Sequence, residues 1–146
     1  MKLNLLAATL LVTPLLLVSP ARAERTSDVE QLLSTGQCFQ CDLSGADLRQ
    51  AHLIGADLRE ANLAGANLSQ ANLEGADLTG ANLRSANLTS VFLTNASLND
   101  ADLDRANLTA AIINTADVSG ASMEDMTITD AQIYNTQIGV GGSYDE

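Results

Sequence analysis

Two cysteines, Cys38 and Cys41, have the spacing that most directly suggests chemistry in this chain of 146 residues. Haem attachment by a C-x-x-C pair requires a histidine immediately afterwards, and Asp42 stands there instead. A zinc site requires a full tetrahedral set of ligands, whereas His52 is the only histidine in the chain. A thioredoxin-like pair lies at the start of a helix, but this pair follows a helical pattern and precedes a strand repeat. Three interpretations stay open: a structural disulfide, which we favour, a redox role, and a pair of free buried thiols.

The remaining polar residues give weaker indications of a site. His52 has no serine or cysteine nucleophile arranged near it, so we interpret it as a solvated surface histidine. Asp57 and Asp77 stack as like charges in the architecture described below, but carboxylates at one spacing do not enclose a divalent cation. The chain has no phosphate loop, dinucleotide fingerprint or hydrolase motif. We therefore expect no enzyme activity, no cofactor and no bound metal ion.

An apolar residue at every fifth position determines which structure carries these groups. Leucine fills this position from Leu43 to Leu108 without a miss, and a small residue, usually alanine, stands two positions earlier. The expected inward-facing core centres are Leu43, Leu48, Leu53, Leu58, Leu63, Leu68, Leu73, Leu78, Leu83, Leu88, Leu93, Leu98, Leu103, Leu108, Ile113, Val118, Met123, Ile128, Ile133 and Ile138.

A period of five fits neither a regular helix nor a flat strand. Five residues turn an α-helix by roughly 500°, so successive leucines would form no stripe on it. On a flat strand an odd period sends alternate leucines to opposite faces. The conflict is removed if the chain bends once per repeat, so that every leucine points to one axis. Such a coil pairs its backbone with the turns above and below it, which predicts an all-β solenoid.

The repeats read CDLSG-ADLRQ-AHLIG-ADLRE-ANLAG and onward, which closely resembles the A-(D/N)-L-x-x signature of the pentapeptide-repeat family. The resemblance extends from Cys41 to Val140. It implies a right-handed quadrilateral parallel β-helix with four repeats per coil. The twenty repeats would then make about five coils over residues 38–140.

Residues 1–23 have the features of a cleavable signal peptide. Lys2 gives a positive start, residues 3–18 form an apolar run, and Ala21-Arg22-Ala23 fits a small-residue cleavage site. The run is short for a membrane span, so we expect no stable membrane insertion after cleavage. A mature chain beginning at Glu24 would have a net charge of −13 in place of −11, which is expected to repel nucleic acid. Export indicates the periplasm, or the thylakoid lumen if the chain is like exported cyanobacterial members of the family.

The first coil of a solenoid exposes its core and needs a cap. Residues 24–37 are expected to form a short amphipathic capping helix. Ser27 and Glu30 have the spacing of a capping box, and Gly36 suits the helix end. The apolar residues expected on the core-facing side of this helix are Val29, Leu32 and Leu33.

The opposite end of the solenoid has no comparable covering segment in the sequence. Residues 141–146 form a tail that is too short and glycine-rich for a capping helix. The unpaired edges of the last coil would then be free to pair with another copy. We favour a weak end-to-end homodimer there, and the alternative is a tail that folds back and places Tyr144 over the isoleucines.

With four repeats per coil, residues twenty apart stack vertically on the surface. This predicts two ion pairs, between Arg84 and Asp104 and between Arg105 and Asp125. It also predicts a less polar face, whose outward residues are Ile54, Phe92, Ile112 and Tyr134. An apolar run on one face is a candidate protein-binding patch.

These features favour a non-enzymatic exported scaffold that binds an unknown protein partner through its extended faces. The family also contains acidic members that mimic duplex DNA and bind gyrase, and the acidity and rod shape of this chain agree with that alternative. The leader disagrees with it, because an exported protein does not meet a cytoplasmic topoisomerase. Redox sensing through Cys38 and Cys41 is a further alternative.

Overall fold

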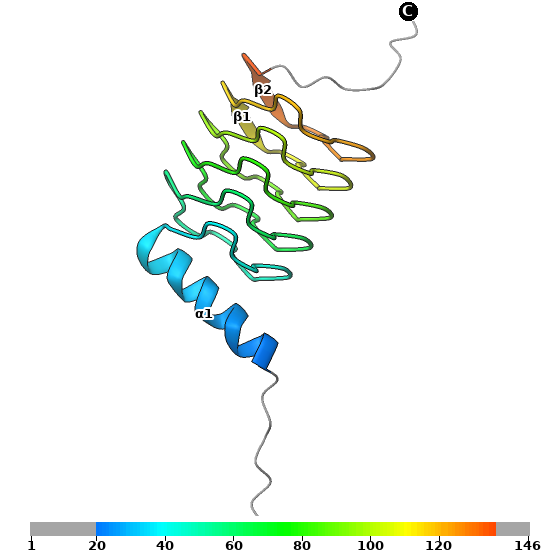
Figure 1. Ribbon diagram of the computed structural model, residues 1–146. Coiled ribbons are helices and arrows are strands. Elements are labelled where there is room, and N and C mark those ends of the chain that lie inside the picture. The colour runs from blue at the N-terminus through cyan, green and yellow to red at the C-terminus, as the bar shows by residue number, and fades with distance from the viewer. Residues whose placement is uncertain (1–19, 137–146) are drawn as a thin grey trace, which may run out of the picture.

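The computed structural model describes residues 20–136, with side chains from residue 27 onward. Helix α1 (Pro20–Thr35) leads into a stack of similar turns (Figure 1). Two short strands, β1 (Ile112–Asn114) and β2 (Gln132–Tyr134), pair in parallel near the end of the stack. Most of the expected signal peptide, the core centre at Ile138 and the tail 141–146 lie outside the described residues.

The turns are joined by parallel backbone bridges between residues twenty positions apart. One such column connects Asp42 with Asn62 and Asn62 with Asn82. The amide of Asn62 donates to the Cys41 carbonyl at 2.9 Å, and the amide of Leu63 donates to the Asn82 carbonyl at 2.8 Å. Four pentapeptides therefore make one turn of a parallel β-helix, and residues 37–136 form five such turns.

Each repeat bends at its last residue, which has a positive φ. Glycine fits this left-handed conformation at Gly65 (φ 65°), but Gln70 adopts it too, with φ 61°. Fourteen of these corner positions are filled by residues other than glycine. The corner is what allows an odd period to keep every leucine on the inside.

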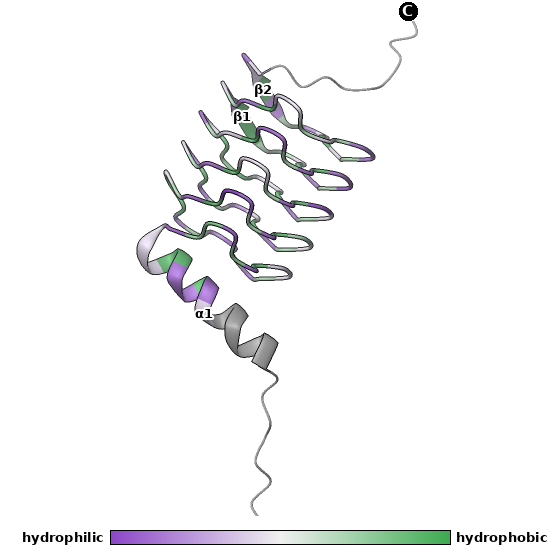
Figure 2. Cartoon of the chain, in the orientation of Figure 1, coloured by the Kyte–Doolittle hydropathy of each residue, from purple (hydrophilic) through white to green (hydrophobic). Residues whose placement is uncertain are grey.

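The leucine centres form one continuous core along the axis. Leu43 to Leu108, Ile113 and Val118 are all buried, together with most of the alanines two positions before them. Hydrophobic and hydrophilic residues alternate around the turns (Figure 2). In the last turn, Met123, Ile128 and Ile133 are only half-buried, because no further described turn lies over them.

Helix α1 covers the first turn, but it differs from the expected cap in two respects. It begins at Pro20, so Ser27 lies inside the helix and is not its N-terminal capping residue. Leu32 is 1% exposed, whereas Leu33 is 55% exposed, since only one narrow stripe of the helix contacts the coil. The helix ends at Thr35, and Gly36 follows with φ 70°, a conformation that suits glycine.

Candidate functional site

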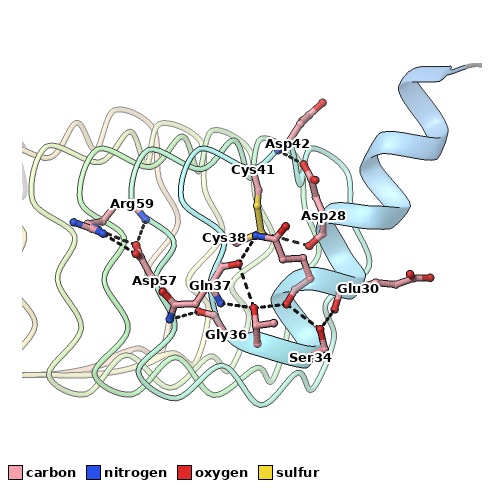
Figure 3. Close-up of a disulfide and its surroundings, with 12 residues drawn as sticks. Asp28, Glu30, Ser34, Gly36, Gln37, Cys38, Cys41, Asp42, Asp57 and Arg59 are labelled. Carbon is pink, nitrogen blue, oxygen red and sulfur yellow. Dashed lines mark hydrogen bonds and ion pairs between the residues drawn. A yellow bond between two sulfur atoms is a disulfide. The ribbon is translucent and has the colours of Figure 1, made fainter.

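Cys38 and Cys41 form a disulfide inside the first turn, directly under α1 (Figure 3). The S–S distance is 2.07 Å, and the two residues are 0% and 7% exposed. The Asp28 carbonyl oxygen of α1 lies 3.4 Å from Cys38 Sγ, and the Asp28 carboxylate accepts a hydrogen bond from the Asp42 amide at 2.8 Å. The disulfide therefore lies between helix and coil, where another thiol has little access to its sulfur atoms.

The stacked carboxylates of Asp57 and Asp77 are bridged by an arginine. The Arg59 guanidinium lies 2.7 Å from an Asp57 oxygen and 3.9 Å from an Asp77 oxygen. It also lies 5.4 Å from the centre of the half-exposed Phe39 ring, a distance typical of a cation–π contact. The hydrogen bond from Arg59 lowers the pKa of Asp57 below its ordinary value. The Arg59 guanidinium thus offsets part of the negative charge of the two carboxylates.

Asp104 is a nearly buried carboxylate that joins three successive turns. One oxygen accepts hydrogen bonds from the Ser122 hydroxyl at 2.6 Å and the Glu124 amide at 2.9 Å. The other lies 2.6 Å from Arg84, which also reaches Asp102 at 3.0 Å. Hydrogen bonds from Ser122 and then Glu124 lower the pKa of Asp104, and Arg84 lowers it further. The structure therefore contains the expected Arg84–Asp104 pair.

Sequence reasoning missed why Asp104 is bonded in this way. In most repeats an Asp or Asn before the leucine accepts the amide two residues later, as Asn82 does for Arg84. Ser122 occupies that position in the last turn, and Asp104 of the preceding turn accepts the Glu124 amide in its place. The sequence contained an indication of this bonding, because Ser122 stands at a position that is usually Asp or Asn.

The second expected ion pair is absent from the part of the chain that the structure describes. Arg105 and Asp125 stack in one column, but both are exposed corner residues with positive φ and form no ion pair. Two solvated side chains gain little from pairing, because water screens their charges.

The candidate interaction face lies on one side of the rod. Parallel bridges connect Phe92 with Ile112, and β1 and β2 align Asn114 with Tyr134. Phe92 is 42% exposed, Tyr134 is 59% exposed, and Ile112 is half-buried. We call the outward residues of this side in the last three turns the neutral face; they are Phe92, Thr94, Ile112, Asn114, Gln132 and Tyr134.

Ile54 lies on the same side but outside the neutral face. It is 62% exposed and belongs to the column that contains Glu74 and Thr94. Glu74 separates it from the apolar residues of the later turns. The expected vertical apolar run is therefore interrupted, and its continuous part is Phe92 with Ile112.

The rest of the described surface has depressions but no group of metal-ligating side chains. Within residues 27–136 no three His, Cys, Asp or Glu side chains gather as a metal site. The depressions on the surface are open and polar; one of them is lined by Asp47, Arg49, Gln50, Ser69 and Gln70. No helix in residues 20–136 is long and apolar enough to cross a membrane.

Comparisons with known proteins agree with this architecture. The family model for pentapeptide repeats matches residues 41–80, 76–114 and 86–125. A pentapeptide repeat protein from the thylakoid lumen of Arabidopsis thaliana is similar in structure, with 32% identity and a TM-score of 0.50. That alignment covers 79% of this chain and 74% of the Arabidopsis chain. No curated protein sequence matches the chain.

Two further solved structures are more distant. A pentapeptide repeat protein from the cyanobacterium Cyanothece 51142 has 28% identity and a TM-score of 0.36, with 76% of this chain and 97% of that chain covered. QnrB1, a plasmid-mediated fluoroquinolone resistance protein, has 20% identity and a TM-score of 0.37, covering 68% and 61%. Proteins of this family fold as right-handed β-helices, as the sequence resemblance implied. The chain belongs to the pentapeptide repeat family.

Proposed function

We propose that this protein is an exported, non-enzymatic β-solenoid that binds a protein partner through its outer surface. The observation that carries the proposal is the neutral face, where Phe92 and Tyr134 stay exposed on a rigid wall of bridged turns. Exposed aromatic side chains are common centres of protein interfaces, because they bury a large area with little loss of conformational freedom.

A capture experiment tests this proposal. The exported form of the chain is immobilised and exposed to a native extract of its own compartment, and the bound proteins are identified by mass spectrometry. A Phe92→Asp variant should lose the partner, whereas Asn72→Asp, one turn earlier in the same column, should retain it. A partner that binds both variants equally would contradict a role for this face.

We further propose that the chain is exported to the periplasm or the thylakoid lumen. The apolar leader supports this, as does the Cys38–Cys41 disulfide, because disulfides persist in oxidising compartments. The similar Arabidopsis protein comes from the thylakoid lumen. N-terminal sequencing of the native protein should find Glu24 first, and recovery of chains that still begin with Met1 would count against processing.

The two alternative functions are less well supported. DNA mimicry needs a continuous acidic strip, but Arg59 and Arg84 pair with acidic residues of the columns and the neutral face carries no charge. A redox sensor needs accessible sulfur, whereas Cys38 and Cys41 are buried under α1. Thiol labelling over a range of reduction potentials would revive the redox role if the pair opens while the solenoid stays folded.

A further inference from the structure

We propose that the neutral face also binds a second copy of this chain, side against side, to form a weak lateral homodimer. The inference rests on the proposed function, because it assumes that this protein acts through its outer faces. It deepens that proposal by naming an occupant for the patch around Phe92 and Ile112. The argument depends on shape, on apolar exposure and on the distribution of charge.

The shape of the neutral face suits contact with a flat partner. Only here, among residues 20–136, does the chain form paired strands, β1 and β2. The amide of Thr115 donates to the Tyr134 carbonyl at 2.9 Å, which continues the pairing beyond the strands. Three bridged turns thus present their outward side chains from a single fixed surface of roughly 14 Å, at about 4.8 Å per turn.

Charge and apolar exposure together favour this face for contact between identical copies. The whole chain has a net charge of −11, so two copies repel each other in most orientations. Two of the other sides carry charges such as Asp57 and Asp104 in their outward columns. The fourth side is also uncharged in its last three turns, but its outward residues there are only Asn and Thr, so it has no exposed apolar side chain. All six side chains of the neutral face are uncharged at neutral pH, and Asp130 is the only charged residue at its two edges over these turns.

The last described turn is a less suitable contact between copies. Its apolar residues, such as Ile128 and Ile133, are still half-buried by the turn below them. The exposed side chains of Glu124, Asp125 and Asp130 surround that end. An end-to-end approach would bring like charges together, whereas a lateral approach through Ile112 would not.

The size of the patch predicts a weak and salt-dependent association. One side of three turns is far smaller than the roughly 800 Å² that each partner buries in a standard interface. Remaining long-range repulsion opposes contact and is screened by salt. The dimer should therefore strengthen as ionic strength rises, which is the opposite of the behaviour expected for binding to a basic partner.

Sedimentation of the purified exported form tests the inference. From about 0.01 M to about 1 M salt the Debye length falls from roughly 30 Å to 3 Å, and the dimer fraction should rise. Phe92→Glu should weaken association by about tenfold or more, because it places a charge in the patch. Asn72→Glu adds the same charge one turn before the patch and should change association by less than about twofold.

Cross-linking provides a second measurement that does not depend on placing a charge at Phe92. Ile112 lies between the turns of Phe92 and Tyr134, so a two-fold axis through it brings the two copies of residue 112 together. Oxidised Ile112→Cys should form a covalent dimer, whereas Thr109→Cys, in the same turn on the neighbouring side, should stay monomeric. The native cysteines do not interfere, because they are already joined.

Each outcome separates this inference from the proposed function. A monomer under all conditions, equal effects of Phe92→Glu and Asn72→Glu, or equal cross-linking of the two cysteine variants would overturn the homodimer. Phe92-dependent capture of a different protein by that monomer would still support the proposed function. Self-association with the expected pattern but no other captured partner would support the homodimer alone.

Discussion

The two ends of the solenoid are built from the same repeat but differ in what covers them. At the first turn, α1 buries Leu32 completely against the core and its Asp28 carboxylate accepts the Asp42 amide. At the last turn, Ile128 and Ile133 are half-buried, and no described segment lies over them. The comparison shows that the core side chains of a pentapeptide turn become fully buried only where a further turn or a helix covers them.

This difference follows from the energetics of one repeat. Burying one leucine contributes about 1.5–3 kcal/mol, while ordering the backbone costs about 1–2 kcal/mol for each residue. One repeat is therefore stable only with the backbone bridges and core contacts of adjacent turns. A middle turn has such contacts on both sides, the first turn has α1 in place of a preceding turn, and the last described turn has only the turn before it. We expect the stack to open from its last turn.

The strongest test compares a middle position with the open end. Leu83→Asp should cost more than about 4 kcal/mol in the free energy of unfolding, because Leu83 is 0% exposed and a buried carboxylate has no partner there. Ile133→Asp should cost much less, since the half-buried side chain can reach water by opening only the last turn. Urea denaturation followed by circular dichroism measures both. Equal losses would show that the last turn is as well protected as the middle.

The covered end can be weakened through its disulfide. Replacing Cys38 and Cys41 by alanine together should lower the free energy of unfolding by about 2 kcal/mol, the value the chain-entropy relation gives for so short a loop. Amides of the first turn should exchange faster with solvent, while those around Leu83 should not. Hydrogen exchange of the two proteins measures this. Faster exchange throughout the solenoid would show that the disulfide stabilises more than the cap.

Much of the architecture could be predicted from the sequence because the spacing of the apolar residues shows which side chains face the core. A leucine at every fifth position requires one bend per repeat, and the corners with positive φ provide that bend. The twenty-residue spacing of bridges came from the family resemblance, since a period of five does not fix the number of sides. The Arg84–Asp104 contact followed from that spacing.

The remaining features depend on contacts that a repeat pattern does not encode. Leu33 looked like a core residue on a helical wheel, but the crossing of α1 over a narrow coil leaves it exposed. Arg105 and Asp125 stack as expected, yet corner residues remain solvated. Arg59 and Phe39 are twenty residues apart, so they lie in one column, but the repeat does not specify that the guanidinium lies over the ring. The columns predicted the apolar residues of the neutral face, whereas their exposed fractions, such as 42% for Phe92, came only from the structure.

Acid conditions should destabilise the last described turns, which Asp104 joins through its hydrogen bonds to Ser122 and Glu124. Its pKa is lowered in the folded state, so the carboxylate stabilises the fold above its unfolded pKa of about 3.9. That contribution is lost as the pH falls through the lower folded pKa, which places the effect below about pH 4. Asp104→Asn removes the titrating group, so its melting temperature should fall less steeply with acid than that of the wild type. Equal slopes for both proteins would contradict this linkage.

The same acid titration can be followed locally. The Glu124 amide donates to Asp104, and its exchange with solvent should accelerate in acid relative to that of Asn62, after correction for the intrinsic pH dependence of exchange. Asn62 donates to a backbone carbonyl near the covered end, which does not titrate. Equal acceleration at the two amides would place the acid effect outside the last turns.

The smallest effect is expected for the arginine near the covered end. Arg59→Ala should change the melting temperature by no more than about 2 °C, because Arg59, Asp77 and Phe39 are about half-exposed, and only the Asp57 side chain, at 18% exposed, is mostly covered. Arg84→Ala should have the larger effect, since it removes the partner of the nearly buried Asp104. Differential scanning calorimetry at low and high salt compares the two variants. If Arg59→Ala is the more damaging change, the exposed contacts near α1 stabilise the fold more than the ion pair of the nearly buried Asp104 does.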